Sequence, residues 1–357
     1  MILYIWKLED GAFNNVAVID DASSVIWVQR LNEIGEFEIY IRASAERLKL
    51  FNEGDVFITR PDSEIAMYVE TVKLDTNEET GDYLTVSGRS AEVILSWRVV
   101  QFYMFNSSDE STENIIRFLF TEKFIAAGVG KIPWVSLETA HGWEEGSPHQ
   151  YTGRSLEEIF NSLCVTYDYG FKLKWLGNGF EFQLYKGTDR SFDQNTNTYV
   201  VFSPEFENLG NTEYIKDTSE YANAAVIGGE GEGSDRVFVS IAEQGKSGFY
   251  FRQVYLDARH SSQEELTLEA YKEQLANDGK DQLEQLRVTA EYTGEVLNYN
   301  QYTYGVDYFL GDKISTKNEY GIKGNAVVTE VTEVEDESGY KLVPTLSEWT
   351  PASYEED

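Results

Sequence analysis

The side chains that could act in catalysis are few and scattered along the chain. The three histidines are His141, His149 and His260, and none belongs to an HExxH motif or an i,i+4 pair that would bind zinc. Asp257 and His260 lie three residues apart and could form a triad with a remote serine, but no G-x-S-x-G elbow accompanies them. We therefore predict no catalytic residue and no metal site of this kind.

The only cysteine, Cys164, falls on the apolar side of a helix predicted over residues 155–165. A single cysteine excludes an intrachain disulfide and indicates synthesis in a reducing compartment. We expect Cys164 to be a buried structural thiol and not a nucleophile.

Two glycine-containing segments suggest phosphate binding only superficially. Residues 228–233, GGEGEG, carry two carboxylates that would repel phosphate, and a strand follows where a helix N-terminus is required. Gly245-Lys246-Ser247 resembles the end of a Walker A motif, but Ser240 stands where the first glycine is needed. The first segment is better interpreted as a strained turn or a close backbone contact. No cofactor is predicted.

Acidic segments at residues 75–79 and 193–197 begin like calcium-binding loops. Both lack the required glycine and the bidentate glutamate, because Thr80, Val86, Thr198 and Pro204 occupy those positions. Both are predicted turns, and a looser surface cation site stays open.

Acidic residues beside aromatic ones favour one competing class of function. Trp143-Glu144-Glu145 and Tyr167-Asp168-Tyr169 are typical of a sugar cleft with two carboxylates. Glycan binding or glycan cleavage is therefore the alternative hypothesis.

Composition limits the remaining classes. The chain has 357 residues, enough for two or three domains, and 62 acidic against 29 basic residues give a net charge of −33. This charge argues against a nucleic-acid-binding groove and against an anionic membrane surface. No run approaches 18 apolar residues, and the N-terminus, MILYIWKLEDG, has no signal-peptide pattern.

The elements that must position these residues are mostly strands. Residues 1–96 contain period-2 alternation typical of a small antiparallel barrel or sandwich, with one helix at 45–51 and a hairpin turn at 78–82. Its predicted strands are 15–19, 25–31, 37–41, 56–60, 66–74 and 83–87.

The rest of the chain is mixed. Ser111 is predicted to cap a helix reaching about residue 127, and Ser155 with Glu158 has capping-box spacing. Hairpins are predicted for 171–175 with 180–185 and for 237–242 with 249–256, and a helix over 264–286. Further strands are predicted at 200–203, 224–228, 286–292, 306–310, 313–315, 327–335 and 340–344. No internal sequence repeat is visible.

An ordered set of motifs resembles one known family. Residues 16–41, VAVIDDASSVIWVQRLNEIGEFEIYI, and 82–95, DYLTVSGRSAEVIL, closely resemble the start of the tail-hub (baseplate hub, tail-associated) proteins of long-tailed bacteriophages, the siphovirus tail protein family. Further similar segments follow in order over the whole chain: 187–191, 201–209, 221–223, 229–233, 255–259, 308–313 and 329–333. One departure is His260, where an acid is expected.

The resemblance implies a mainly β fold with α+β parts, like that of a phage baseplate hub. Two small antiparallel β-barrel domains would be joined by a mixed α/β domain and a helical inserted domain. The expected domains are 1–96 (first barrel), 97–200 (mixed), 201–235 with 287–357 (second barrel), and 236–286 (inserted hairpin plus helix).

The implied function is structural and not enzymatic. Such a hub is a homotrimeric ring at the distal end of the tail tube, which closes the tube and anchors the tail tip. The implied partners are its own copies, distal-tail or tail-tube proteins, the tape-measure protein and a tail fibre or receptor-binding protein. DNA would only pass through the lumen. The protein would be made in the bacterial host cytoplasm and act in the virion tail tip, and the chain would be a bare hub ending at Asp357. Its acidity would serve solubility or line that lumen.

Four residues of the first two motifs are the expected ring interface: Trp27, Arg30, Glu33 and Arg89. Trp27 is equally expected to be an ordinary core residue.

Overall fold

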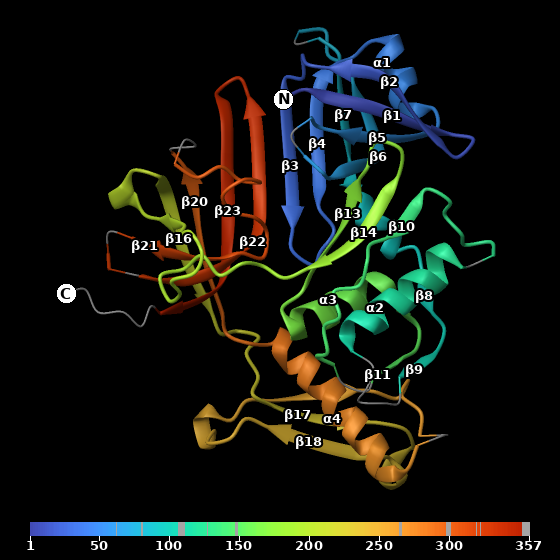
Figure 1. Ribbon diagram of the computed structural model, residues 1–357, viewed down its shortest axis with the longest axis vertical. Coiled ribbons are helices and arrows are strands. Elements are labelled where there is room, and N and C mark those ends of the chain that lie inside the picture. The colour runs from blue at the N-terminus through green and yellow to red at the C-terminus, as the bar shows by residue number, and fades with distance from the viewer. Residues whose placement is uncertain are drawn as a thin grey trace.

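The computed structural model (Figure 1) describes residues 1–61, 63–79, 81–105, 111–126, 128–146, 149–263, 266–297, 301–318, 320–321 and 323–351. Strands dominate, and four separate clusters of buried apolar side chains hold the elements together. The mainly β fold class with mixed and helical parts is confirmed.

The first β unit comprises residues 1–90. Its elements are β1 (Leu3–Glu9), β2 (Ala12–Ile19), β3 (Ser24–Arg30), β4 (Glu36–Arg42), α1 (Ala45–Asn52), β5 (Asp55–Thr59), β6 (Ala66–Asp75) and β7 (Tyr83–Ser90). The strands pair antiparallel in the order β3-β4-β7-β6-β5-β1-β2. Side chains such as Leu3, Trp27, Ile39 and Val86 meet in one core to which all seven strands contribute, so the sheet curls around it.

The sequence missed β1 altogether. Leu3 and Ile5 point into the core, but the intervening Tyr4 and Trp6 are also apolar, so the period-2 pattern is masked.

The mixed unit spans residues 91–185 and packs under the first. Its elements are η1 (Ala91–Leu95), β8 (Val99–Val100), β9 (Tyr103–Phe105), α2 (Thr112–Phe120), η2 (Thr121–Ile125), β10 (Val135–Leu137), β11 (His149–Tyr151), β12 (Arg154–Ser155), α3 (Leu156–Tyr167), β13 (Gly170–Trp175) and β14 (Phe180–Tyr185). The predicted capping box of α3 is confirmed, since Ser155 accepts from the Glu158 amide and the Glu158 carboxylate accepts from the Ser155 amide. The β13–β14 hairpin is also confirmed.

The second β unit consists of two segments separated by an insertion. Its elements are β15 (Val201–Phe202), η3 (Pro204–Phe206), β16 (Leu209–Asp217), β20 (Thr289–Val296), β21 (Lys313–Lys317), β22 (Lys323–Asp336) and β23 (Gly339–Pro351). Their order is β16-β20-β23-β22-β21-β15. The strand predicted at 306–310 is wrong: this segment forms only an isolated bridge between Tyr304 and Tyr308, and the Tyr308 ring packs into the core.

The inserted unit occupies residues 218–288. It contains β17 (Ala224–Gly228), η4 (Gly233–Asp235), β18 (Phe238–Ala242), η5 (Gly248–Tyr250), β19 (Gln253–Asp257) and α4 (Leu268–Gln285). The predicted hairpin of 237–242 with 249–256 is wrong, because β17 lies between β18 and β19 and pairs with both. This central place also puts β17 in the inserted unit and not in the second β unit, where the sequence had suggested it. Ile227 of β17 packs against Tyr271 and Leu275 of α4.

The two β units share one sheet and one strand order. β3 pairs antiparallel with β22, which joins them into a 13-stranded sheet, with β3 and β22 side by side in Figure 1. The order β3-β4-β7-β6-β5 in the first unit recurs as β16-β20-β23-β22-β21 in the second. No visible sequence repeat accompanies this structural repeat. Within the described residues the strand pairing is an open path from β16 to β2, and no ladder closes either unit.

In the part of the chain that the structure describes, none of the helices has the length and apolar character needed to cross a membrane.

Candidate functional site: the seam between the two β units

The seam is the pairing of β3 residues 25–30 with β22 residues 330–335. At its centre Trp27 is fully buried, and the Arg60 guanidinium carbon lies 5.0 Å from the centre of its ring. Arg60 donates to Glu333 at 2.9 Å, with both side chains at most 5% exposed, and the Tyr340 hydroxyl donates to the same carboxylate at 2.6 Å. The buried charges are therefore compensated by each other and by a neutral hydrogen-bond donor.

A row of charges of alternating sign begins at one rim of the seam and crosses the neighbouring strands. Arg30 donates to Glu330 of β22 at 2.7 Å and to Glu36 of β4 at 2.6 Å. Glu36 lies directly opposite Arg89 of β7, which donates twice to Glu70 of β6, at 2.7 Å each. The row crosses β22, β3, β4, β7 and β6, and two of the four expected interface residues belong to it.

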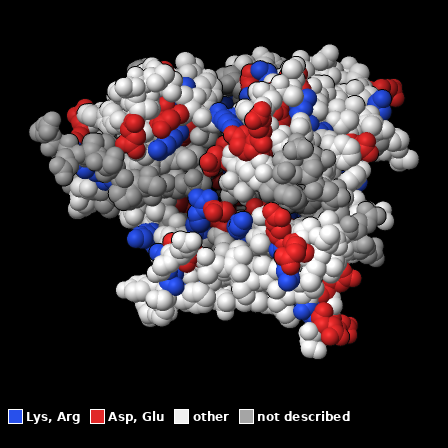
Figure 2. All heavy atoms as spheres, turned by 60° about the horizontal axis from the view of Figure 1, so that its bottom comes forward, with Lys and Arg blue, Asp and Glu red and all other residues white. Residues whose placement is uncertain are grey.

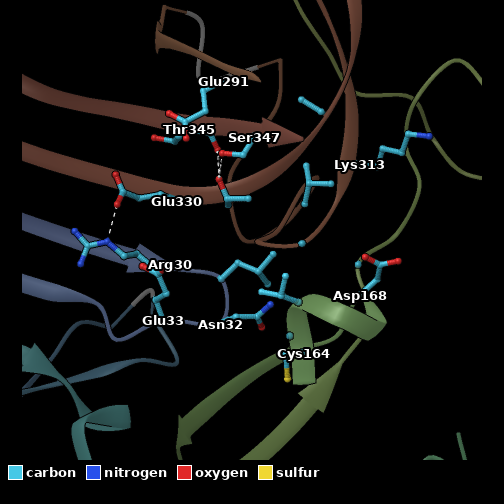
Figure 3. A pocket seen from close by; sticks show the side chains of 18 of the residues that line it. Arg30, Asn32, Glu33, Cys164, Asp168, Glu291, Lys313, Glu330, Thr345 and Ser347 are labelled. Atoms are coloured by element: carbon cyan, nitrogen blue, oxygen red, sulfur yellow. Dashed lines mark hydrogen bonds and ion pairs between the residues drawn. The ribbon is translucent and has the colours of Figure 1, made fainter. Parts of the chain in front are cut away.

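A cavity of about 930 Å³ opens beside the seam, between the second β unit and α3. In Figure 3, the Arg30–Glu330 pair bridges one wall, Cys164 lies on α3, Asp168 directly follows α3, and Lys313 lies on the far side. The charged side chains of the wall are Glu33, Asp168, Asp189, Glu213, Glu291 and Glu330 against Arg30 and Lys313. The cavity is thus polar and predominantly acidic.

The chemistry available in this cavity is limited. Burial raises the pKa of the Cys164 thiol well above its ordinary value, which leaves it protonated and inert, as the sequence indicated. Among the described residues, no group of three or more His, Cys, Asp or Glu side chains is arranged to hold a metal ion.

The four expected interface residues lie in three different surroundings. Arg30 and Glu33 both line the large cavity and a neighbouring one of about 430 Å³. Arg89 stands in the charged row, whereas Trp27 has no exposed surface and belongs to the core of the first β unit. A side chain without exposed surface can influence a subunit contact only through the residues around it.

Sequence reasoning missed the residues that cover Trp27. Arg60 and Glu333 are 273 positions apart in the chain, so no local spacing relates them. The only signal was indirect. Glu333 is a charged residue within the strand predicted at 327–335, at a position where alternation predicts a buried side chain.

Asp257 and His141, two of the described members of the histidine-containing candidates, are both engaged by groups around them. Asp257 accepts from Arg236 at 2.6 Å and lies 3.2 Å from Arg259, so its carboxylate is held by cations. The Nε2 atom of His141 lies 2.9 Å from the Leu184 carbonyl oxygen, and the ring stacks on Trp143 with centroids 4.3 Å apart. His141 thus packs against Trp143 and the backbone of β14. The His149 side chain, Pro148, and Thr80 of the first calcium-like segment lie outside the described residues.

The two aromatic–acidic segments of the glycan hypothesis do come together, but around a lysine. Lys186 lies 4.9 Å from the Trp143 ring centre and 4.8 Å from that of Tyr169, and it forms a 2.9 Å ion pair with Glu145. Hydrogen bonds from Lys186, a backbone amide and Tyr169 lower the pKa of Glu145 to about 2. A carboxylate with such a low pKa is a poor general acid, and the protein's own side chain fills the aromatic cage.

The glycine-rich segment 228–233 is a close-packed turn. A Cβ on Gly229 would lie 2.4 Å from the Tyr271 hydroxyl oxygen, and Arg236 donates to the carbonyl oxygens of Gly228 and Gly229. The interpretation as close backbone packing therefore agrees with the structure.

A second charged boundary lies between α3 and α4. Burial raises the pKa of Asp278 to about 7, with a further contribution from the nearby Asp281, and burial likewise raises the pKa of Asp281 to about 7. Ser261 donates to Asp278 at 3.3 Å and Thr166 to Asp281 at 3.3 Å. Arg154 is close enough to lower both pKa values, but not to cancel the effect of burial.

Surface charge shows no single acidic strip on the face seen in Figure 2. Acidic and basic side chains are interspersed there among neutral ones. On this face, the distribution fits the interpretation of the net charge as a source of solubility.

Comparison with known proteins gives a consistent result. Residues 2–346 match the family described as Siphovirus ReqiPepy6 Gp37-like protein. The chain is similar in structure to the 43 kDa tail protein of prophage MuSo2 from Shewanella oneidensis, with 14% identity over 97% of this chain and 98% of that chain and a TM-score of 0.57. It is also similar to the tail protein from Neisseria meningitidis MC58, with 12% identity, 97% and 96% coverage and a TM-score of 0.56.

A third solved structure is the prophage tail protein gp18 from Listeria monocytogenes EGD-e, with 11% identity, 97% and 94% coverage and a TM-score of 0.52. At these identities the similarity establishes the fold. No curated protein sequence matches the chain.

Proposed function

This chain belongs to the siphovirus Gp37-like family of phage tail proteins, and on that basis we propose that it is the hub of a phage or prophage tail, a homotrimeric ring at the distal end of the tail tube. The observation that carries the proposal is the repeated strand order of the two β units within one continuous sheet. Three such chains supply six similar β units, which is the number needed to match a six-fold tube.

The proposed mechanism is mechanical. The ring mates with distal-tail or tail-tube proteins above and closes the tube until the tape-measure protein and the DNA leave. The mixed and inserted units lie to one side of the shared sheet, where they are available to anchor a fibre or receptor-binding protein (Figure 1). DNA passes through the lumen without a binding groove, in keeping with the net charge of −33.

The proposed role is not enzymatic. Three features support this: the protonated thiol of Cys164, the cation-bound carboxylate of Asp257 and the low pKa of Glu145. The protein is a component of the virion tail, and we propose that it is made in the host cytoplasm and placed at the tail tip.

The proposed division into four domains follows the buried clusters. The clusters of the first β, mixed, second β and inserted units support boundaries close to those expected from the sequence. The insertion starts after β16, because β17 pairs only with strands of the inserted unit.

Absolute mass tests the proposal. Light scattering on the purified chain should give about three times 40.7 kDa, and negative-stain images of the same peak should show a ring with a central hole. A compact monomer that also fails to trimerise with its tail-tube partner would refute the hub. Specific binding in a glycan screen would then favour the alternative function.

A further inference from the structure

The two β units correspond strand for strand in more than their order. In the first unit the β6–β7 ladder carries a bulge between Val69 and Thr71, and in the second the β22–β23 ladder carries one between Val328 and Glu330. Both bulges lie just beyond the strand's pairing with its outer neighbour, β5 or β21. The equivalence of β6 with β22 and of β7 with β23 therefore extends to individual residues.

Counting paired residues outward from these bulges gives the equivalent residues in the next two strands of each unit. Phe37 of β4 corresponds to Tyr292 of β20, since their partners in β7 and β23 are equivalent. One strand further, Trp27 of β3 pairs with Phe37, and Tyr214 of β16 pairs with Tyr292. Trp27 and Tyr214 thus hold the same place, and both are aromatic side chains packed on their own unit's core.

Within the chain, the seam joins two specific edges. The outer edge of β3 pairs with the second half of β22, residues 330–335, beyond the point where β21 ends. The equivalents of these two edges are β16 in the second unit and the second half of β6, residues 71–75, in the first. Among the described residues no strand pairs with either of these edges.

Both edges also expose apolar surface. Ile215 of β16, which also lines the large cavity, is 48% exposed, and Leu74 of β6 is 44% exposed. Both are large side chains in strand segments that are paired on one side only. Unpaired edge strands of this kind readily accept another strand.

We propose that the outer edge of β16 pairs antiparallel with residues 71–75 of β6 in a second copy of this chain, repeating the β3–β22 seam between subunits. This inference rests on the proposed homotrimeric hub and specifies its subunit contact. Two β units per chain and one such contact per neighbour give a heterologous interface that closes after three chains.

The equivalence fixes the register. Trp27 faces Glu333 in the seam, so Tyr214 faces Leu74 of the next subunit, and Ile215 faces Lys73. Lys73 then lies diagonally between Glu213 and Asp217 of β16, the charge arrangement that stabilises neighbouring antiparallel strands. The aromatic–aliphatic pair of Tyr214 and Leu74 lies on the opposite face.

Cysteine cross-linking tests this register. In the full-length double variant Ile215→Cys/Lys73→Cys, the two Cβ atoms of neighbouring subunits would be about 4.5–5.5 Å apart, near the range for a disulfide. Mild oxidation should convert the protein into covalent trimers on a denaturing gel. The native Cys164 is buried and contributes no background.

The matched control is Ile215→Cys/Leu74→Cys, which moves one exposed thiol by one residue and so to the other face of the sheet. This variant should remain largely uncross-linked. Equal or preferential cross-linking of the control would refute the register. If neither variant cross-links, the proposed contact between β16 and β6 of neighbouring subunits is refuted.

The mass of the unmodified protein separates the two proposals. A trimer by light scattering with no cross-link in the matched variant would keep the hub and overturn this contact. Cross-linking specific to the matched variant, even from a weakly associating protein, would support the contact.

Discussion

Two internal boundaries of this protein bury charge in opposite ways. At the seam between the β units, Arg60 and Glu333 neutralise each other in a site from which water is almost excluded. Between α3 and α4, Asp278 and Asp281 are buried as acids whose burial outweighs the nearby Arg154. The first boundary pairs two opposite charges, whereas the second is fully satisfied only when its carboxyl groups hold protons.

The difference has a mechanical consequence. Backbone pairing and a compensated ion pair join the two β units. The raised pKa values of Asp278 and Asp281 predict that the contact between the mixed and inserted units weakens as pH rises, so the inserted unit is the part that we expect to separate first.

The largest effect is expected for Trp27→Ala. Removing a fully buried tryptophan costs about 3–5 kcal/mol of the free energy of unfolding, with loss of the Arg60 contact added. Urea unfolding of the variant checks this. A variant with unchanged stability but impaired trimerisation would instead assign Trp27 to the subunit interface.

A loss of about 3–5 kcal/mol is expected for Glu333→Ala, because Arg60 would remain buried without its carboxylate partner. The double variant Arg60→Met/Glu333→Leu removes both charges and should regain much of that stability. If Glu333→Ala were as stable as the parent protein, the seam would not depend on charge compensation.

A pH-dependent loss of about 2–4 kcal/mol is expected at the contact between α3 and α4. Because the pKa values of Asp278 and Asp281 are raised from 3.8 to about 7, their contribution is complete below about pH 4 and is lost as pH rises through about 7. Hydrogen exchange of α4 amides, corrected for intrinsic rates, should show weaker protection at about pH 8.5 than at about pH 5.5. Amides of β22 serve as the internal reference.

Asp278→Asn is the control for this pH effect. It removes one buried titrating group, so α4 should be better protected at high pH and its pH dependence should become shallower. Identical pH profiles in the parent and variant proteins would contradict the role of Asp278.

The smallest effect is expected for Glu330→Gln. The Arg30–Glu330 pair is a quarter or more exposed on both sides, and such pairs contribute about 0–1 kcal/mol. Thermal unfolding should therefore change little. A loss comparable to that of Glu333→Ala would erase the distinction between the rim and the centre of the seam.

Local patterns were predictable because their causes are local. The capping box of Ser155 and Glu158, the alternation of β4 and the hairpin of β13 and β14 depend on residues a few positions apart. The inertness of Cys164 also followed from its place on an apolar helix face.

Pairing partners were less predictable. A turn between β18 and β19 favoured a hairpin, but the sequence could not reveal that β17 would insert between them. The repeat of the two β units was invisible for the same reason. Strand order depends on which strand edges meet, and these contacts join residues far apart in the chain.

By itself, the sequence determined the mainly β class, the family and the absence of recognisable catalytic motifs, since alternation, turns and ordered motifs are written along the chain. Only the tertiary structure decided that Trp27 is buried beneath Arg60 and Glu333 and that β3 meets β22. The physical reason is that such contacts join residues hundreds of positions apart, where packing and charge compensation choose the partner.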